Sequence, residues 1–348
     1  MTPPCESTHG AIAAARGSTV AYGAVLGAAL CCYAALGSVL SILPRYVPDQ
    51  LGGDPVAIGL AVGAPALTGL LARPLGGRLA DRLGPRPLVL AGAAGMALAA
   101  LPAVVSPTIG ALVLSRLAVG ACEGVMMSAT VLWLLRVAAP ERRGRALGHI
   151  GLANFGGLAL GPLLAAGLGG ASAAREVLEL AVALPLLGAA AVVAIAAPAP
   201  VRRDPAPAST GALVRHTARA GIGLLLVNVG YVSVLSFGAE VARVQATGIE
   251  NVIVPVFAVT VIAARTLGAG LPDRLGGRRT VVLFAGAEAA GLLVFAVAGA
   301  PGPALAALIV LSIGQSLVVP GLGLLALDRV PAAQQGAAAG LFFAWFDA

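Results

Sequence analysis

The sequence predicts an all-α, polytopic membrane protein of two six-helix bundles, related by a pseudo-two-fold axis along the membrane normal, with the last helices missing. Apolar residues make up 59% of the 348 residues, and the mean hydropathy is +0.95. Only 11% of the residues are charged, against about 25% in an ordinary soluble domain. The apolar residues also lie in blocks of about 20, the length that crosses the hydrocarbon core of a bilayer.

Eleven apolar blocks predict the helices in chain order. They are 18–42, 56–71, 88–105, 109–135, 146–168, 177–197, 221–239, 252–271, 280–298, 304–327 and a block that begins near Gly336. The predicted domains are a cytoplasmic N-terminal tail (1–17), an N-terminal six-helix bundle (18–197), a Pro- and Arg-rich cytoplasmic linker (198–220) and an incomplete C-terminal bundle (221–348).

The basic residues predict the orientation of the chain. All 22 are Arg. If the N-terminus lies inside, all of them fall in inner segments except Arg45, Arg175 and Arg243 in outer loops and Arg116 within the fourth helix. This bias follows the positive-inside rule. It accounts for the net charge of +7 without a nucleic-acid partner, and it predicts a multi-pass protein of the cell membrane with a cytoplasmic N-terminus.

A repeat relates the two predicted bundles. Asp81-Arg-Leu-Gly84 occurs again as Asp273-Arg-Leu-Gly276, and the offset 273 − 81 = 192 also pairs Arg73 with Arg265. The same offset pairs Arg86 with Arg278, Gly144 with Gly336, and Gly148 with Gly340. By this offset Ala348 corresponds to Gly156, early in the fifth helix, so the repeat predicts about 40 further residues, the rest of helix 11 and all of helix 12.

The repeated segment resembles the loop signature of the major facilitator superfamily, Gly-x-x-x-Asp-Arg/Lys-x-Gly-x-Arg/Lys-Arg/Lys. The first copy runs from Gly77 to Pro87 and has Pro at the last basic position, whereas the second copy has Ala269 in place of the leading Gly. The resemblance covers essentially the whole chain and implies a transporter with gating loops. The implied gating residues are Gly77, Asp81, Arg82, Gly84, Arg86, Asp273, Arg274 and Gly276.

Asp81 is the leading gate candidate. A carboxylate at the cytoplasmic mouth can pair with a basic side chain or with a helix N-terminus of the other half, and such a pair would break when the halves rock. The alternative is a solvated loop charge. Asp273 is the structural counterpart of Asp81.

A helix 5 pattern refines the resemblance. Gly148, Gly157 and Gly161-Pro162 look like the motif of the exporting branch, the drug/proton antiporters of the multidrug or sugar efflux permease type. Ala165-Ala166 stands where the pattern usually ends in a Gly pair. The small residues also predict close helix packing, which is compatible with a role in sealing the pathway.

Arg116 and Glu123 are the candidate proton-coupling residues. An ionisable group at membrane depth costs at least about 2.5–3.5 kcal/mol, so it needs a partner, a wet cavity or a function. Seven residues are two helical turns, so both side chains are expected on one face, about 10 Å apart and directed to the central cavity. The alternative is a buried ion pair that only fixes helix packing.

Four further polar residues are candidate substrate contacts: Asn154, Asn228, Gln315 and Asp347. The alternative for the three amides is hydrogen bonding between helices. Glu288, in the ninth helix, is expected to have a packing or snorkelling role.

These features favour a secondary transporter that exports a small molecule in exchange for protons by alternating access. An uptake symporter or facilitator for a sugar, organic acid or anion is the first alternative, and a non-transporting receptor or scaffold is the second. No enzymatic activity, cofactor or metal is expected, because neither Cys nor His shows a suitable spacing. The expected partners are a small-molecule substrate, protons and the bilayer, and we expect a monomer.

Overall fold

The computed structural model describes residues 6–195, 210–328 and 330–347. Its long helices are α1 (Glu6–Leu51), α2 (Pro55–Leu83), α3 (Pro85–Val105), α4 (Ile109–Val137), α5 (Arg143–Leu168), α6 (Ala174–Val193), α7 (Thr210–Val244), α8 (Ile253–Leu267), α10 (Gly277–Val297), α11 (Pro301–Leu327) and α12 (Gln335–Asp347). A short helix, α9 (Leu271–Leu275), precedes α10. In the described residues, nine helices are long and apolar enough to cross a membrane. The eleven predicted helices and the all-α fold are therefore confirmed.

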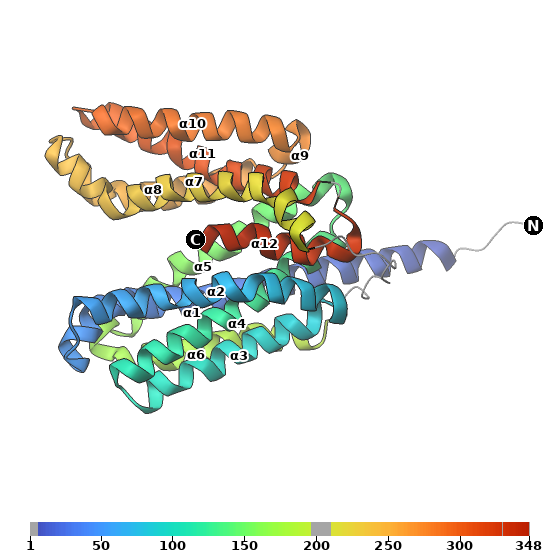
Figure 1. Ribbon diagram of the computed structural model, residues 1–348, viewed down its shortest axis with the longest axis horizontal. Coiled ribbons are helices and arrows are strands. Elements are labelled where there is room, and N and C mark those ends of the chain that lie inside the picture. Colours follow the sequence, from blue (N-terminus) through green and yellow to red (C-terminus); the bar gives the residue numbers. More distant parts are fainter. Residues whose placement is uncertain (1–5, 196–209, 329, 348) are drawn as a thin grey trace, which may run out of the picture.

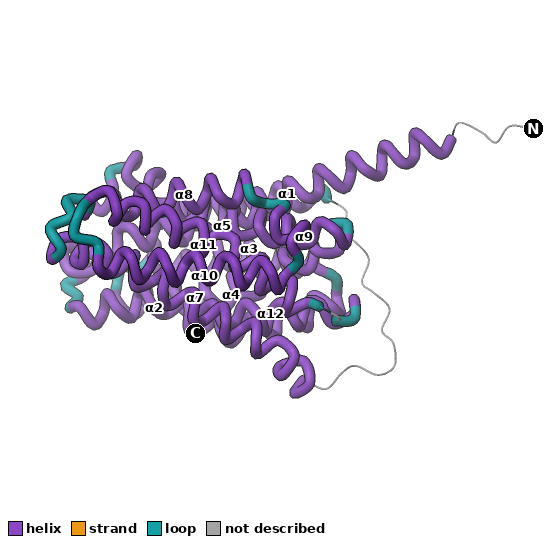
Figure 2. The backbone as a smooth tube through the Cα atoms, turned by 90° about the horizontal axis from the view of Figure 1, so that it is seen from above, coloured by secondary structure: helices purple, strands orange, loops and turns teal. Residues whose placement is uncertain are grey.

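The helices form two bundles, α1–α6 and α7–α12. Figure 1 shows the first bundle below and most of the second above, with α5 and α12 running between them. Across this interface α12 packs on α2, and α5 packs on α8 and α11. Figure 2 shows the helices running along one common direction, with the start of α1 projecting beyond the others. The interface between the bundles is thus formed by helices of both repeats.

The helix boundaries differ from the predicted ones wherever polar residues continue a helix past its apolar block. The segment predicted as a loop after the second helix is helical, because α2 continues to Leu83 and its backbone turns only at Gly84, where φ is 86°. Gly276, the repeat-related residue, ends α9 with a φ of 77°. Both are positions that glycine adopts readily. Asp81 therefore lies on a helix and not in a flexible loop.

Two helices begin earlier in the chain than predicted. The helix α1 begins at Glu6, inside the predicted tail. The helix α7 begins at Thr210, inside the predicted linker, because Thr210–Ala220 contains no Pro and is rich in residues that favour helix. The remainder of the linker, 198–209, lies outside the described residues.

Candidate functional site

A cavity of about 250 Å³ lies between the two bundles. It is lined from α1, α2, α4 and α5 on one side and from α8, α11 and α12 on the other. Most of the lining is apolar, and the charged residues among those described are Arg73, Arg116, Arg265 and Glu123. A binding site at the interface of the two repeats is the arrangement expected for alternating access.

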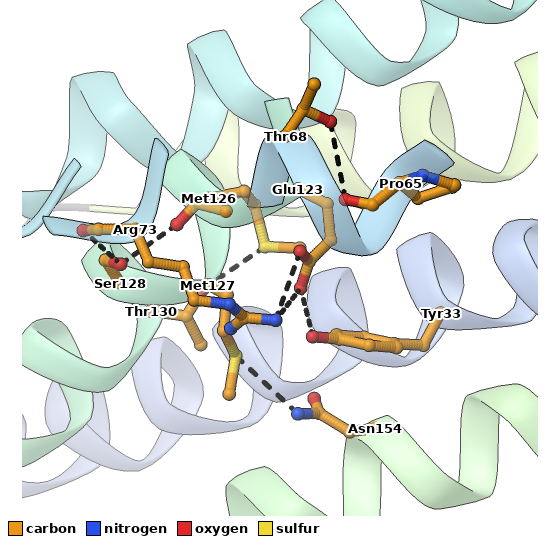
Figure 3. Close-up of polar contacts among 11 residues, drawn as sticks. Tyr33, Pro65, Thr68, Arg73, Glu123, Met126, Met127, Ser128, Thr130 and Asn154 are labelled. Carbon is orange, nitrogen blue, oxygen red and sulfur yellow. Dashed lines mark hydrogen bonds and ion pairs between the residues drawn. The ribbon is translucent and has the colours of Figure 1, made fainter. Parts of the chain in front are cut away.

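Arg116 and Glu123 both line the cavity, but they do not form the ion pair with each other. Glu123 pairs with Arg73 of α2 at 3.3 Å, and Tyr33 of α1 donates a hydrogen bond to the same carboxylate (Figure 3). Arg116 instead donates from Nε to the Ala61 carbonyl at 3.0 Å. The suggested Arg116–Glu123 pair is therefore wrong, because α2 carries Arg73 into the interior at two turns' distance from Asp81.

Arg73 and Arg265, which the sequence places in inner segments, lie on the helices α2 and α8 and line the cavity. Their exposed fractions are only 4% and 1%. The guanidinium carbon of Arg265 lies 4.7 Å from the ring centroid of Phe155, a residue of α5 in the other bundle. Gly151 leaves room for this guanidinium, since a Cβ there would overlap Arg265 Nη1. Tyr33 and Phe155 were not predicted as site residues, because a single aromatic residue in an apolar helix carries no distinguishing pattern.

The predicted polar contacts separate into two groups. Asn154 lines the cavity, and its amide nitrogen lies 3.6 Å from the sulfur of Met127. Asn228 and Gln315 are not among the lining residues. Asn228 donates to the Phe346 carbonyl at 2.8 Å, which ties α7 to α12, and Gln315 is buried within α11 with an exposed fraction of 1%. The Asp347 side chain lies outside the described part of the structure.

Glu288 is also buried, on α10, and it is not a lining residue of the cavity. A Cβ on Gly314 of α11 would approach the Glu288 backbone nitrogen to 2.6 Å, so the two helices touch at this point. This position is consistent with the packing role expected for Glu288.

Asp81 joins the two bundles at one end of the molecule. Its carboxylate accepts hydrogen bonds from the backbone N–H groups of Gly336 and Ala337, at 3.0 and 2.8 Å, in the first turn of α12. Arg136 of α4 lies 3.6 Å from the same carboxylate. A carboxylate at a helix N-terminus neutralises the positive end of the helix dipole and satisfies N–H groups that lack a helical partner.

Asp273 makes the repeat-related contact at the same end. It accepts from the N–H groups of Gly144 and Arg145, at 2.6 and 2.8 Å, in the first turn of α5. Each bundle thus supplies one carboxylate and receives one. The side chains of Arg82 and Arg274 are exposed, and Arg86 donates to the Val193 carbonyl at the end of α6. None of these three arginines joins the bundles through a hydrogen bond or ion pair found in the described residues.

Glycines permit the closest approach at the Asp81 contact. A Cβ on Gly77 would collide with the Gly336 carbonyl, and a Cβ on Gly340 would collide with the Arg73 carbonyl. The backbones of α2 and α12 therefore touch here. The leading Gly of the motif is explained by this contact.

The glycines of helix 5 serve a second contact, within the N-terminal bundle. A Cβ on Gly157 would lie 2.6 Å from the Leu30 carbonyl, and one on Gly161 would collide with the Ala34 carbonyl. Pro162 is half-buried beside them. Gly148 faces the other bundle, where Pro320 of α11 lies 4.0 Å from its ideal Cβ position. The motif thus fits α5 against α1.

Comparisons with known proteins agree with this architecture. The model of the Major Facilitator Superfamily matches residues 25–348. An MFS-type transporter of Burkholderia mallei (strain SAVP1) is 30% identical over 327 residues, which cover 91% of this chain and 79% of the relative. An MFS-type transporter of Pseudomonas aeruginosa (strain LESB58) is 32% identical over 336 residues, which cover 90% and 80%.

Solved structures are similar in fold. The human organic anion transporter MFSD10 (TETRAN) superposes with a TM-score of 0.78 at 19% identity, covering 95% of this chain and 90% of that chain. The transporter FucP in its outward conformation gives a TM-score of 0.78 at 16% identity, covering 95% and 89%. At these identities the likeness concerns the fold alone.

Proposed function

The chain belongs to the major facilitator superfamily and is a secondary transporter, and on this premise we propose that it exports a small molecule in exchange for protons. The binding site would be the cavity between the bundles, opened to each side of the membrane in turn. The observation that carries the proposal is the pair of contacts by which Asp81 and Asp273 join the bundles at one end of this cavity.

In this proposal the Asp81 and Asp273 contacts are the gate of the cytoplasmic side. Each consists of charge-assisted hydrogen bonds to a helix that borders the space between the bundles. Rocking of one bundle against the other would break both contacts together, because both lie at the same end of the interface. The N-terminus and the Arg-rich connections would then face the cytoplasm of the cell.

Glu123 is the proposed proton carrier. It holds the single carboxylate among the described lining residues of the cavity, and its exposed fraction is 5%. Protonation would remove its ion pair with Arg73 and change the charge that the substrate meets. A proton and a substrate of suitable charge would then compete for one site, which is the coupling that an exchanger requires.

The direction of transport rests on the helix 5 motif, whose glycines support a closely packed α1–α5 pair. The cavity lining supports an amphiphilic substrate more than a sugar. Its neutral polar side chains in the described part of the chain are those of Tyr33 and Asn154. A sugar site needs several such groups to replace the hydrogen bonds of its hydroxyls.

The test uses inverted membrane vesicles that contain the full-length protein and a pH-sensitive dye. After respiration acidifies the lumen, compounds from a panel are added, and a substrate of an exchanger is expected to release luminal protons. Vesicles with Glu123→Gln are the control and should show no release. Release that persists in Glu123→Gln would reject this residue as the proton carrier.

A further inference from the structure

The repeat pairs Arg73 with Arg265, but the residue that corresponds to the ion-pair partner of Arg73 differs in the second bundle. The offset of 192 that pairs Arg73 with Arg265 also pairs Glu123 with Gln315, since 315 − 123 = 192. The carboxylate that neutralises Arg73 is therefore replaced by a neutral amide in the second half.

The helices that carry these residues keep the same register in both bundles. In the first bundle, a Cβ on Gly124 of α4 would lie 2.9 Å from the Gly69 carbonyl of α2. At the matching positions, Ser316 Oγ of α11 lies 3.0 Å from the Val261 carbonyl of α8. Glu123 and Gln315 thus occupy equivalent positions in the packing of the two bundles, and they differ in charge.

A second pair of contacts gives the same register. A Cβ on Gly76 would lie 2.7 Å from the Cα atom of Val125, and one on Gly268 would lie 3.1 Å from the side chain of Leu317. These residues are again 192 positions apart. A carboxylate introduced at 315 would therefore occupy, relative to Arg265, the place in the packing that Glu123 occupies relative to Arg73, and it would put a negative charge next to the helix that carries Arg265.

Arg265 has no carboxylate partner among the described residues. Its exposed fraction is 1%, and its Nε and Nη2 atoms are buried without a hydrogen-bond acceptor in that part of the chain. A buried guanidinium without an acceptor is costly, so a site that keeps one is suited to an anionic ligand. Phe155 lies against the guanidinium and adds an aromatic surface beside the charge.

The net charge of the cavity lining also favours an anionic ligand. Arg73, Arg116 and Arg265 oppose Glu123 alone among the described lining residues. Arg116 uses Nε for a backbone carbonyl and has no carboxylate partner in the described residues. The two guanidinium groups without a carboxylate partner come from opposite bundles, and the lining between them is mostly apolar.

From these observations we propose that the cavity binds an amphiphilic organic anion, whose acidic group is held by Arg265 and whose apolar part lies beside Phe155. The proposal rests on the proposed transport function and specifies its substrate class. A planar guanidinium recognises carboxylate, sulfonate or phosphate groups through paired hydrogen bonds, and the weak screening in a buried site strengthens them.

The test is a binding measurement without an ion gradient, so it does not depend on transport or on coupling. Purified full-length protein is titrated with three probes that share one skeleton: phenylbutyrate, its neutral amide and phenylbutylamine. The anion is expected to bind at least about tenfold more tightly than the amide, and the amine more weakly than either. Equal binding of the three probes, or tighter binding of the amine, would overturn the proposal.

Variants locate the binding of the anion. Arg265→Gln should remove the preference for phenylbutyrate, and Arg265→Lys should keep part of it. Gln315→Glu should also remove it, by giving Arg265 the partner that Arg73 has, whereas the matched control Gln315→Leu should keep it. An unchanged preference in both Arg265→Gln and Gln315→Glu would overturn the assignment to Arg265.

Folding and function are separated by two further measurements. Thermal unfolding and size-exclusion profiles identify a variant that fails to fold, and the preference in the remaining variants then decides the assignment. Proton release caused by a cationic or neutral compound, together with no binding of phenylbutyrate, would leave the exchanger function standing and reject the anionic substrate class.

Discussion

Arg73 and Arg265 occupy matching places in the two bundles, yet among the described residues only Arg73 has a carboxylate, at 3.3 Å. The Asp81 and Asp273 contacts differ in a related way. Asp81 is buried with an exposed fraction of 6% and lies where the backbones of α2 and α12 touch. Asp273 is half-buried, and its motif has Ala269 where the first copy has Gly77.

The duplicated fold thus keeps the positions of these polar residues in both bundles, while the groups around them differ. The first bundle has the neutralised arginine and the more deeply buried end contact, at which two helix backbones touch. The second has the unneutralised arginine and the more exposed end contact. The two halves are therefore expected to respond differently to equivalent substitutions, and the following three experiments test that difference.

The largest effect is expected from the buried ion pair. Glu123→Gln leaves Arg73 buried without its counter-charge, and breaking such a pair costs about 3–5 kcal/mol. The thermal unfolding temperature should fall clearly in detergent. The equivalent change in the second half, Gln315→Leu, removes an amide whose two polar atoms have no partner in the described residues, so it should be close to neutral. Equal destabilisation by both variants would show that the halves do not differ at this place.

An intermediate effect is expected at the ends of the bundles. Asp81→Asn removes the charge that faces the first turn of α12, and charge-assisted hydrogen bonds contribute about 1.5–3 kcal/mol. Turnover should fall about tenfold or more, with substrate affinity nearly unchanged. Asp273→Asn should reduce turnover less, because its carboxylate is more exposed to water. Equal loss of turnover and affinity in Asp81→Asn would count against a gate.

The smallest effect is expected from a single methyl group. Gly77→Ala places a Cβ against the Gly336 carbonyl and should force α2 and α12 apart by a few tenths of an ångström or more. Distances between spin labels across this end of the molecule should then broaden. Ala269→Gly is the matched change in the second half and should leave the corresponding distances unaltered. Similar broadening in both variants would show that the two end contacts do not differ in how closely their helix backbones approach.

Much of the fold follows from the sequence alone. The order of the eleven helices was predictable because each carries an apolar block, and in the described residues nine of them are long enough to cross a membrane. The repeat was predictable because Asp81 and Asp273 stand in identical four-residue motifs. The helix ends were not, because α2 continues past its apolar block through charged residues such as Arg73 and Asp81, which are buried against other helices.

The candidate site was less predictable. The predicted second helix ends at Leu71, so the sequence placed Arg73 in a loop. The ion pair between Arg73 and Glu123 was therefore not predicted. The stacking of Phe155 on Arg265 joins residues from two bundles, and neither spacing nor composition reports such a contact.

The contacts of Asp81 and Asp273 have a consequence for how the protein can change over time. Both carboxylates bond to main-chain N–H groups, so the side chains of Ala337 and Arg145 take no part in these bonds. Those two positions can therefore accept other residue types that preserve the helix, without loss of the hydrogen bonds that join the bundles. The contact between the bundles therefore depends on two aspartates and on the backbone geometry of two helix N-termini, and not on a particular side chain at Ala337 or Arg145.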